Sequence, residues 1–426
     1  MLARVRSNLR LADMLQAALS GNADAGEALE RNGAQRFGFP HALLFPYARA
    51  ALHALLVAGG FRAREVLCPA YICAEVPYAI TAAGCPVRFV DSAADHFLPG
   101  ALEWQKAADR NVAMAVVTPL FGYPVDKEAE RQLRQAAPGI FVLYDESQSF
   151  GVEDAGGLQM RDADGALLSF GLGKMVTALS GGLLLLRDVE LHRAVRTLRD
   201  SQYAQPTALH GMGLALKGLA AWTAFREPAL SLLEFAAHRL RLLPARAEDW
   251  LPAHGPALPA DGKVMPSGYQ AGIGLRQFAR LDDFLAARRG IARHYESCLH
   301  ARAFRTFDHA GTPTWPRYPW PVAARETVVS ALRRHGVQVS LFLPYSCAEL
   351  PVYRDQQHAC PNAALWGRSM INLPNWHGMR VDRAEGVVDI LVRLREQNSG
   401  SVAWPTASAA VAVPSDGVSP RRLGVP

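Results

Sequence analysis

The stretch that decides the fold runs from residue 144 to residue 182 and reads YDESQSFGVEDAGGLQMRDADGALLSFGLGKMVTALSGG. Asp145 ends an apolar run, IFVLY, that is typical of a buried strand. A second apolar run, ALLSFGL, carries Ser169, and Lys174 follows it in a glycine-flanked turn. An aspartate, a serine and a lysine are therefore all predicted at strand ends of one sheet.

Around this stretch, from residue 49 to residue 186, helical patterns alternate with short runs that are apolar throughout. The predicted strands are EVLCPAY, PVRFVD, AMAVVTPLF, IFVLYDES, ALLSFGL and GGLLLLRD. This order predicts an α/β fold, with a mostly parallel sheet covered by helices on both faces. Ligands of such sheets bind beyond the carboxyl ends of the strands, where Tyr71, Asp145, Gln148 and Ser169 fall.

The rest of the chain predicts a large domain with several additions. They are an N-terminal helical arm (1–36), the large domain (37–265) with a helix-rich extension (191–265), a long connecting helix (266–300), a small α+β domain (301–396) and a disordered tail (397–426). In the small domain we expect the order strand, helix, strand, from PWPVAA, ETVVSALRRHG and VQVSLFLP. The N-terminal MLARVRSNLRLADMLQAAL is predicted to be a helix and not a signal peptide, because it lacks an apolar core.

The most apolar long segment, 211–235, is predicted to be a helix that is buried or lies at a subunit contact. Charged residues such as Lys217 and Arg226 interrupt it, so it does not read as a membrane span.

Composition excludes some classes of function. The 426 residues carry a formal charge of +6, but the cations are scattered among 39 acidic residues, so we expect no nucleic-acid binding. Six cysteines without a CxxC pair are typical of reduced thiols, which predicts a cytoplasmic protein, and no metal site is expected. Nearly all cations are arginine, so a retained lysine suggests a need for an amine, which can form an imine as a guanidinium cannot.

The central stretch matches the needs of pyridoxal 5'-phosphate (PLP) chemistry. A lysine amine holds this cofactor as a Schiff base, a carboxylate keeps its ring nitrogen protonated, and hydroxyls and helix-start N–H groups hold its phosphate. The rival interpretation of GLGK is a nucleotide P-loop, but that motif needs glycine and Ser/Thr where this chain has Leu168 and Met175. By spacing alone, Lys174 can also be a surface turn residue, Asp145 a helix cap and Ser169 a small filler.

At this point the sequence resembles the DegT/DnrJ/StrS group of fold-type-I PLP enzymes, over about residues 37–396. The stretches that carry the resemblance are YARAALHALL, EVLCPAYICAEVPYAITAAGCPVRFVD, TPLFGYPVD, DESQS (the family's "DAAQA"), SFGLGK with its later SGG, GYQAGIGLRQFARLDDFLAARRGIARHY and NLPNWHG. The resemblance implies a fold-type-I large domain and a smaller α+β C-terminal domain.

The resemblance also implies roles for individual residues. Lys174 would be the Schiff-base lysine, Asp145 the partner of the ring nitrogen, and Gln148 the neighbour of the phenolic oxygen. Ser169 and the backbone at Ala48 and Arg49 would hold the phosphate. Cys73 occupies the position of the ring-stacking residue, and nearby Tyr71 is the aromatic alternative.

Three positions depart from the family pattern. Ala48 stands where glycine is usual, which requires a negative φ there. Pro119 replaces a common histidine, and the segment through which the partner subunit usually contributes an asparagine reads KVMPSG, in which Lys263 or Ser267 would have to substitute.

By resemblance, the function is amino transfer from an amino-acid donor, glutamate in most members, to a nucleotide-linked keto-sugar. The product would feed polysaccharide or secondary-metabolite synthesis, and the enzyme would be a homodimer with shared active sites. Dehydrating relatives carry histidine in place of the lysine, so Lys174 favours transamination. Two alternatives stay open: a PLP enzyme of the same fold that acts on a non-sugar ketone or cyclitol, and a non-catalytic scaffold.

Overall fold

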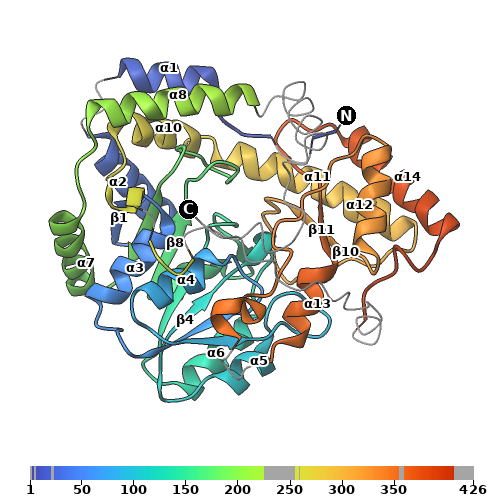
Figure 1. The fold of residues 1–426 in the computed structure, drawn as a ribbon, viewed down its shortest axis with the longest axis horizontal. Coiled ribbons are helices and arrows are strands. Elements are labelled where there is room, and N and C mark those ends of the chain that lie inside the picture. The colour runs from blue at the N-terminus through green and yellow to red at the C-terminus, as the bar shows by residue number, and fades with distance from the viewer. Residues whose placement is uncertain are drawn as a thin grey trace, which may run out of the picture.

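A seven-stranded sheet forms the centre of the computed structural model, which describes residues 2–3, 6–20, 24–224, 255–258, 260–354 and 359–406 (Figure 1). In spatial order its strands are β1 (His41–Phe45), β9 (Gly182–Leu186), β8 (Gly165–Ser169), β5 (Phe141–Asp145), β4 (Val112–Val117), β2 (Glu65–Pro69) and β3 (Val87–Val90). The pairs from β8 to β3 are parallel, whereas β9 runs antiparallel to both of its neighbours. The predicted α/β class with a mostly parallel sheet is confirmed, although β1 was not predicted.

Helices cover this sheet on both faces, as its apolar strands require. The covering helices are α2 (Ala25–Phe37), α3 (Ala48–Ala58), α4 (Glu75–Ala82), α5 (Ala101–Ala107), α6 (Lys127–Ala136) and α7 (Val189–Gln202). α2 packs against β1 and β9, and α3 against β8 and β9. Every residue of β4 and of β9 is buried, which is typical of a strand shielded on both sides.

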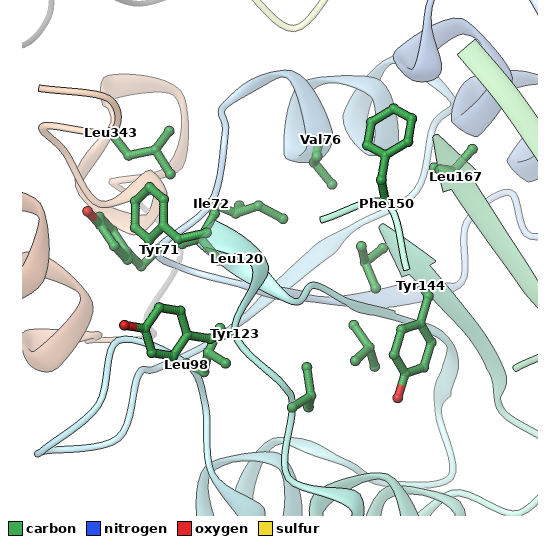
Figure 2. Packing of buried hydrophobic residues seen from close by; sticks show 14 of the residues in the cluster. Tyr71, Ile72, Val76, Leu98, Leu120, Tyr123, Tyr144, Phe150, Leu167 and Leu343 are labelled. Atoms are coloured by element: carbon green, nitrogen blue, oxygen red, sulfur yellow. The ribbon is translucent and has the colours of Figure 1, made fainter. Parts of the chain in front are cut away.

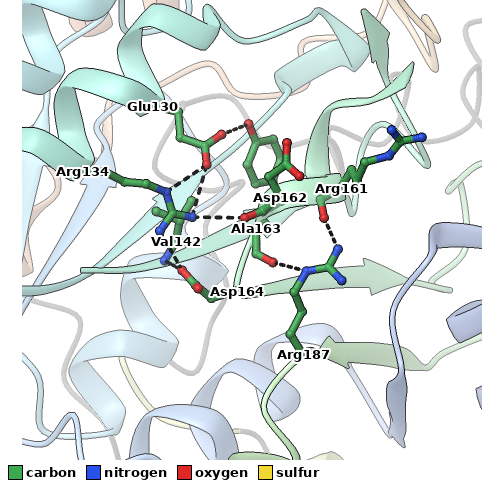
Figure 3. A network of polar contacts seen from close by, with 9 residues as sticks. Glu130, Arg134, Val142, Arg161, Asp162, Ala163, Asp164 and Arg187 are labelled. Atoms are coloured by element: carbon green, nitrogen blue, oxygen red, sulfur yellow. Dashed lines mark hydrogen bonds and ion pairs between the residues drawn. The ribbon is translucent and has the colours of Figure 1, made fainter. Parts of the chain in front are cut away.

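A polar network fastens the amino ends of β5 and β8 (Figure 3). Asp164, just before β8, accepts hydrogen bonds from the Val142 N–H (2.8 Å) and from Arg134 (3.2 Å). Arg187 donates to the carbonyl of Ala163 over 2.9 Å. These contacts lie at the edge of the sheet opposite to Asp145 and Ser169, which end the same two strands.

A smaller α+β unit follows the large domain. Its elements are α11 (Leu281–Ala301), β10 (Tyr318–Pro321), α12 (Arg325–Arg334), α13 (Pro361–Ser369), β11 (Met370–Leu373) and α14 (Val381–Gln397). β10 pairs with β11 in an antiparallel ribbon, and α14 packs on both α11 and α12. The predicted second strand at 337–344 is wrong, because this extended segment forms only isolated bridges, such as the one between Ser340 and Asn372.

The predicted long connecting helix is in fact two helices, α10 (Gly268–Phe278) and α11. The break falls at Arg280, whose φ of −110° and ψ of 13° leave the helical region. Arg280 donates to the carbonyl of Arg276 and to the carboxylate of Asp13 in the N-terminal arm. Tertiary bonds to another segment thus interrupt a pattern that looks continuous in sequence.

Both ends of the described chain also differ from expectation. Among the described residues of the predicted N-terminal helix, only Leu11–Leu19 (α1) are helical, and Leu2 instead bridges to Val337 of the small unit. Part of the predicted disordered tail is packed, since the ring of Trp404 lies 4.8 Å from that of Phe307. The remainder of the tail, 407–426, lies outside the described residues.

The apolar segment at 211–235 is described only as far as α8 (Ala208–Ala224). The remainder of that segment lies outside the described residues, which omit residues 225–254 of the 191–265 extension. α8 lies beside α1 at one edge of the molecule, and within the described ranges no helix is long and apolar enough to span a bilayer (Figure 1).

Candidate active site

The strand ends bring the predicted residues to one edge of the sheet. Asp145 of β5 lies opposite Leu167 of β8, and Ser169 ends β8 two residues further along. Ser169 lies opposite Gly182, the first residue of β9. Lys174 sits in the turn between β8 and β9, where its side chain and that of Ser169 both border Gly171.

Lys174 places its amine in a desolvated position beside other ionisable groups. Burial lowers the pKa of Lys174, although Cys73 and Asp145 act in the opposite direction, and nearby Arg317 lowers it further. A lowered pKa increases the share of neutral amine, which is the form that attacks a carbonyl. The environment therefore favours imine chemistry at this lysine over a role as a solvated surface residue.

Asp145 offers a buried carboxylate near that amine. The residue is 6% exposed, and its Oδ1 accepts a hydrogen bond from the Ser147 N–H at 3.0 Å. This is the hydrogen bond that the Asp145 side chain makes with the described residues, and it leaves Oδ2 uninvolved. One oxygen is thus fixed by the turn that follows β5, and the other remains for a ligand.

The predicted phosphate turn lies at the start of α3. The first N–H groups of a helix have no partner within it, so those of Ala48 and Arg49 suit an anion. The φ at Ala48 is not positive, so alanine fits where the family has glycine. Gly182 lies directly against this turn, which puts Ser169 on the neighbouring strand within reach of it.

We predict that Gly182→Ala damages this turn. A methyl group at Gly182 would lie 2.3 Å from the Ala48 nitrogen and 2.5 Å from the Tyr47 carbonyl carbon, so backbone must move. Overpacking of this kind costs about 1–3 kcal/mol. Thermal unfolding should show the loss of stability, and dialysis binding should show weaker PLP retention.

The control for this prediction is Gly386→Ala in α14, where nothing lies within 4 Å of the added methyl group. Equal cofactor retention by the G182A and G386A variants would contradict the placement of the phosphate.

The remaining site residues fall at different distances from the amine. Gln148 is buried in the turn after β5. Burial raises the pKa of the Cys73 thiol, and the nearby amine of Lys174 lowers it by a smaller amount, so the two side chains are neighbours. Tyr71 instead packs in the core (Figure 2), with its ring 6.3 Å from that of Phe121. Its hydroxyl is buried without a hydrogen-bond partner in the described structure. Cys73, rather than Tyr71, is therefore the neighbour of the amine, and the ring-stacking role of either stays a prediction.

Three charged residues of the site were not predicted. Glu75 pairs with Arg49 over 2.7 Å and acts on the charge of Lys174. Arg317 reaches the site from the segment before β10, with its guanidinium 4.1 Å from the centre of the Phe342 ring. Glu146 is fully buried next to Asp145. Only Glu146 left a signal in the sequence, as a charge inside the DESQS motif.

The residues proposed to replace the family's asparagine have other contacts. The hydroxyl of Ser267 accepts the Gln270 N–H at 3.3 Å and caps α10. The charge of Lys263 acts on His53 and lowers its pKa, after the larger effect of burial. Neither contact involves Lys174.

The residues present fit the cofactor expected from the resemblance. A desolvated amine, a buried carboxylate with an available oxygen, and a helix start beside a serine are gathered at one sheet edge. This donor set matches the aldehyde, the ring nitrogen and the phosphate of PLP.

Comparisons with known proteins identify the family of this chain. The model of the DegT/DnrJ/EryC1/StrS aminotransferase family matches residues 5–217 and 265–392. The segment between the two matches, 218–264, falls within the predicted helix-rich extension at 191–265.

Solved structures share the fold across nearly their whole length. The sugar aminotransferase CalS13 from Micromonospora echinospora is 18% identical, with a TM-score of 0.70, and covers 92% of this chain and 100% of its own. The aminotransferase TlmJ from Streptoalloteichus hindustanus is 19% identical (TM-score 0.72; 94% and 100%). The GDP-4-keto-6-deoxy-D-mannose-3-dehydratase of E. coli, solved with bound hydrated PLP, is 14% identical (0.72; 92% and 99%). By the family match, which spans most of its length, this chain belongs to the DegT/DnrJ/EryC1/StrS aminotransferase family.

Proposed function

We propose that this aminotransferase holds PLP on Lys174 and moves an amino group from an amino-acid donor, glutamate, to a nucleotide-linked keto-sugar. The observation that carries the proposal is the desolvated amine of Lys174 beside the buried carboxylate of Asp145. Its relatives by fold include a sugar aminotransferase and an enzyme named for a GDP-linked keto-sugar, which supports this acceptor class.

The chain's own residues would divide the work as follows. The cofactor, when bound, draws electrons from the substrate carbon that loses its proton. Lys174, once displaced by the substrate amine, would take up and return that proton. Asp145 would keep the ring nitrogen protonated through its available oxygen, and the start of α3 would hold the phosphate. Lys174 distinguishes this chain from histidine-bearing relatives that dehydrate.

Stepwise incubation of the purified protein tests the proposal. Glutamate alone should remove the visible absorbance of the lysine-bound cofactor and release 2-oxoglutarate. A panel of TDP-, UDP- and GDP-linked keto-sugars should then contain at least one member that restores the absorbance and gains an amino group. If the absorbance is restored only by cyclitol or other non-sugar ketones, the acceptor is of that class and not a nucleotide-linked keto-sugar. No response to any amino donor would contradict amino transfer itself.

We further propose a homodimer, in which the two active sites are shared, working in the cytoplasm on precursors of polysaccharides or secondary metabolites. Six cysteines free of disulfides suit a reducing compartment. Among the described residues, seven of the eleven exposed large apolar side chains lie on α1 and α8, which we call the α1–α8 face. They are Leu11, Leu15, Leu19, Leu209, Met212, Leu216 and Leu219. An apolar concentration of this kind is typical of a protein contact.

We expect Leu216→Glu to weaken the dimer. Leu216 is 70% exposed on the α1–α8 face, so the change should cost little folding stability but place a charge in an apolar contact. Light scattering after gel filtration should shift from dimer toward monomer. The matched control is Leu102→Glu, at a 55% exposed leucine on α5 at the other edge of the molecule (Figure 1). An unchanged dimer in the L216E variant would remove this face from the proposal.

A further inference from the structure

Glu146, which directly follows the proposed cofactor-binding aspartate, is a buried carboxyl that the proposed reaction does not use. Its exposed fraction is 0%, and the family pattern that DESQS resembles has alanine at this position. Burying a carboxyl without a charged partner costs free energy, so its retention calls for a physical reason.

The carboxyl of Glu146 ties together the turn that follows β5. Its Oε2 accepts the Ser149 hydroxyl at 2.5 Å and the Gly151 N–H at 2.9 Å. Its own N–H donates to the carbonyl of Leu167 on β8 at 2.8 Å. One residue thus joins the sheet to the far end of the turn.

The turn needs such a tie because part of its backbone is strained. Phe150 has a φ of 59°, in a region that side chains other than glycine rarely adopt, and Gly151 follows with a φ of 101°. Strained conformations persist only where surrounding bonds over-determine them. The two bonds to Glu146 Oε2 end on either side of Phe150.

The same turn carries the groups that would face the cofactor ring. The Ser147 N–H, inside the turn, donates to Asp145 Oδ1 and so orients that carboxylate. Gln148 is the next residue and is buried. Any movement of the turn would therefore move the ring-nitrogen partner and the expected neighbour of the phenolic oxygen together.

The charge state of Glu146 is compatible with this location. Burial raises the pKa of Glu146 to about 7. Hydrogen bonds from Ser149, Gly151 and Val152 lower this pKa, and the neighbouring Asp145 adds to the rise. Tyr144, which precedes Asp145 on β5, is close enough to Glu146 for the two groups to interact electrostatically. A carboxyl that can remain neutral avoids placing a second full charge beside Asp145.

We propose that Glu146 is a positioning residue: its carboxyl holds the 146–151 turn and thereby fixes Asp145 and Gln148 for the cofactor. The effect on the cofactor rests on the proposed function. The pair of hydrogen bonds from the turn to the Glu146 carboxyl, which we call the tether, does not. Glutamine can replace the tether because its side-chain oxygen accepts the same two hydrogen bonds. Alanine cannot.

The tether is tested first in the cofactor-free protein. Amide hydrogen exchange at residues 147–151 should become about tenfold faster in the E146A variant and stay within about threefold of the parent in E146Q. The S149A variant, which removes a single donor and keeps the fold, should fall between them. Unchanged exchange in both E146A and S149A would overturn the proposal.

The consequence for the site is tested in the loaded enzyme. E146A should weaken PLP binding by about tenfold or more, as loss of a supporting contact typically does, and shift the pH midpoint of the visible band, with rescue by E146Q. The control is Gln159→Ala, at a buried residue outside the site. The side chain of Gln159 accepts a hydrogen bond from the Val125 N–H and donates one to the Val125 carbonyl, each over 2.8 Å. Q159A should lower the melting temperature but leave the band in place.

The possible failures are distinguishable. If the parent protein shows no visible band with PLP, the proposed function fails while the exchange experiment still decides the tether. If the band is present but E146A and E146Q behave alike, the positioning role is wrong and the proposed function stands.

Discussion

Lys174→Ala is expected to abolish covalent attachment of the cofactor and to lower turnover by about 10⁴-fold, the contribution of a positioned proton-transfer group. The variant should fold at least as stably as the parent, because burial lowers the pKa of the Lys174 amine and its removal relieves that desolvation. Single-turnover kinetics and mass spectrometry of the intact protein measure the two losses.

The control for this substitution is Lys106→Ala on α5, at an exposed lysine, which should leave both quantities unchanged. A K174A variant that still carries the cofactor through a covalent bond would contradict the assignment.

Asp145→Ala should give a different phenotype: the cofactor stays attached to Lys174, but turnover falls by about 10²–10³-fold. Without the buried carboxylate the ring nitrogen loses its proton, so the ring withdraws fewer electrons in the rate-limiting state. The visible absorbance before donor addition, together with the rate of its loss after glutamate, separates attachment from turnover.

Asp164→Ala provides the matched control, at an aspartate beside the other end of the same strands (Figure 3). Loss of its bonds to Val142 and Arg134 should reduce the free energy of unfolding by about 1–3 kcal/mol without a comparable effect on turnover. If D164A lost turnover as D145A does, stability and not the ring nitrogen would explain the phenotype.

The parts of the fold that could be predicted from sequence are those in which local pattern and final burial agree. The runs that became β4, β5, β8 and β9 are apolar because both faces of the sheet are covered, so they were recognisable by composition alone.

The local sequence pattern failed to predict the structure where contacts between distant segments determine it. The helix break at Arg280 depends on Asp13, far away in sequence, and the extended start of the chain depends on a bridge from Leu2 to Val337. No local signal encodes either contact. The same limitation applies to strand β1, whose five residues pair with the much later β9.

The site shows the same division. Asp145 and Ser169 end neighbouring parallel strands, and Lys174 follows the second of them. The carboxyl ends of such strands meet at one edge of the sheet, so the sequence could predict that these residues lie together. Arg317 comes from the small unit, and the pairing of Arg49 with Glu75 joins two helices, so neither was visible in sequence. Glu146 was visible as a residue, but its proposed role depends on a strained turn for which the sequence carries no local signal.

The most direct measurement of the central claim is reduction of the PLP-loaded protein with borohydride, followed by peptide mapping. We predict that the visible band disappears and that the mass of the reduced cofactor is found on the peptide containing Lys174. Modification of another lysine, or a band that borohydride leaves unaltered, would contradict the account.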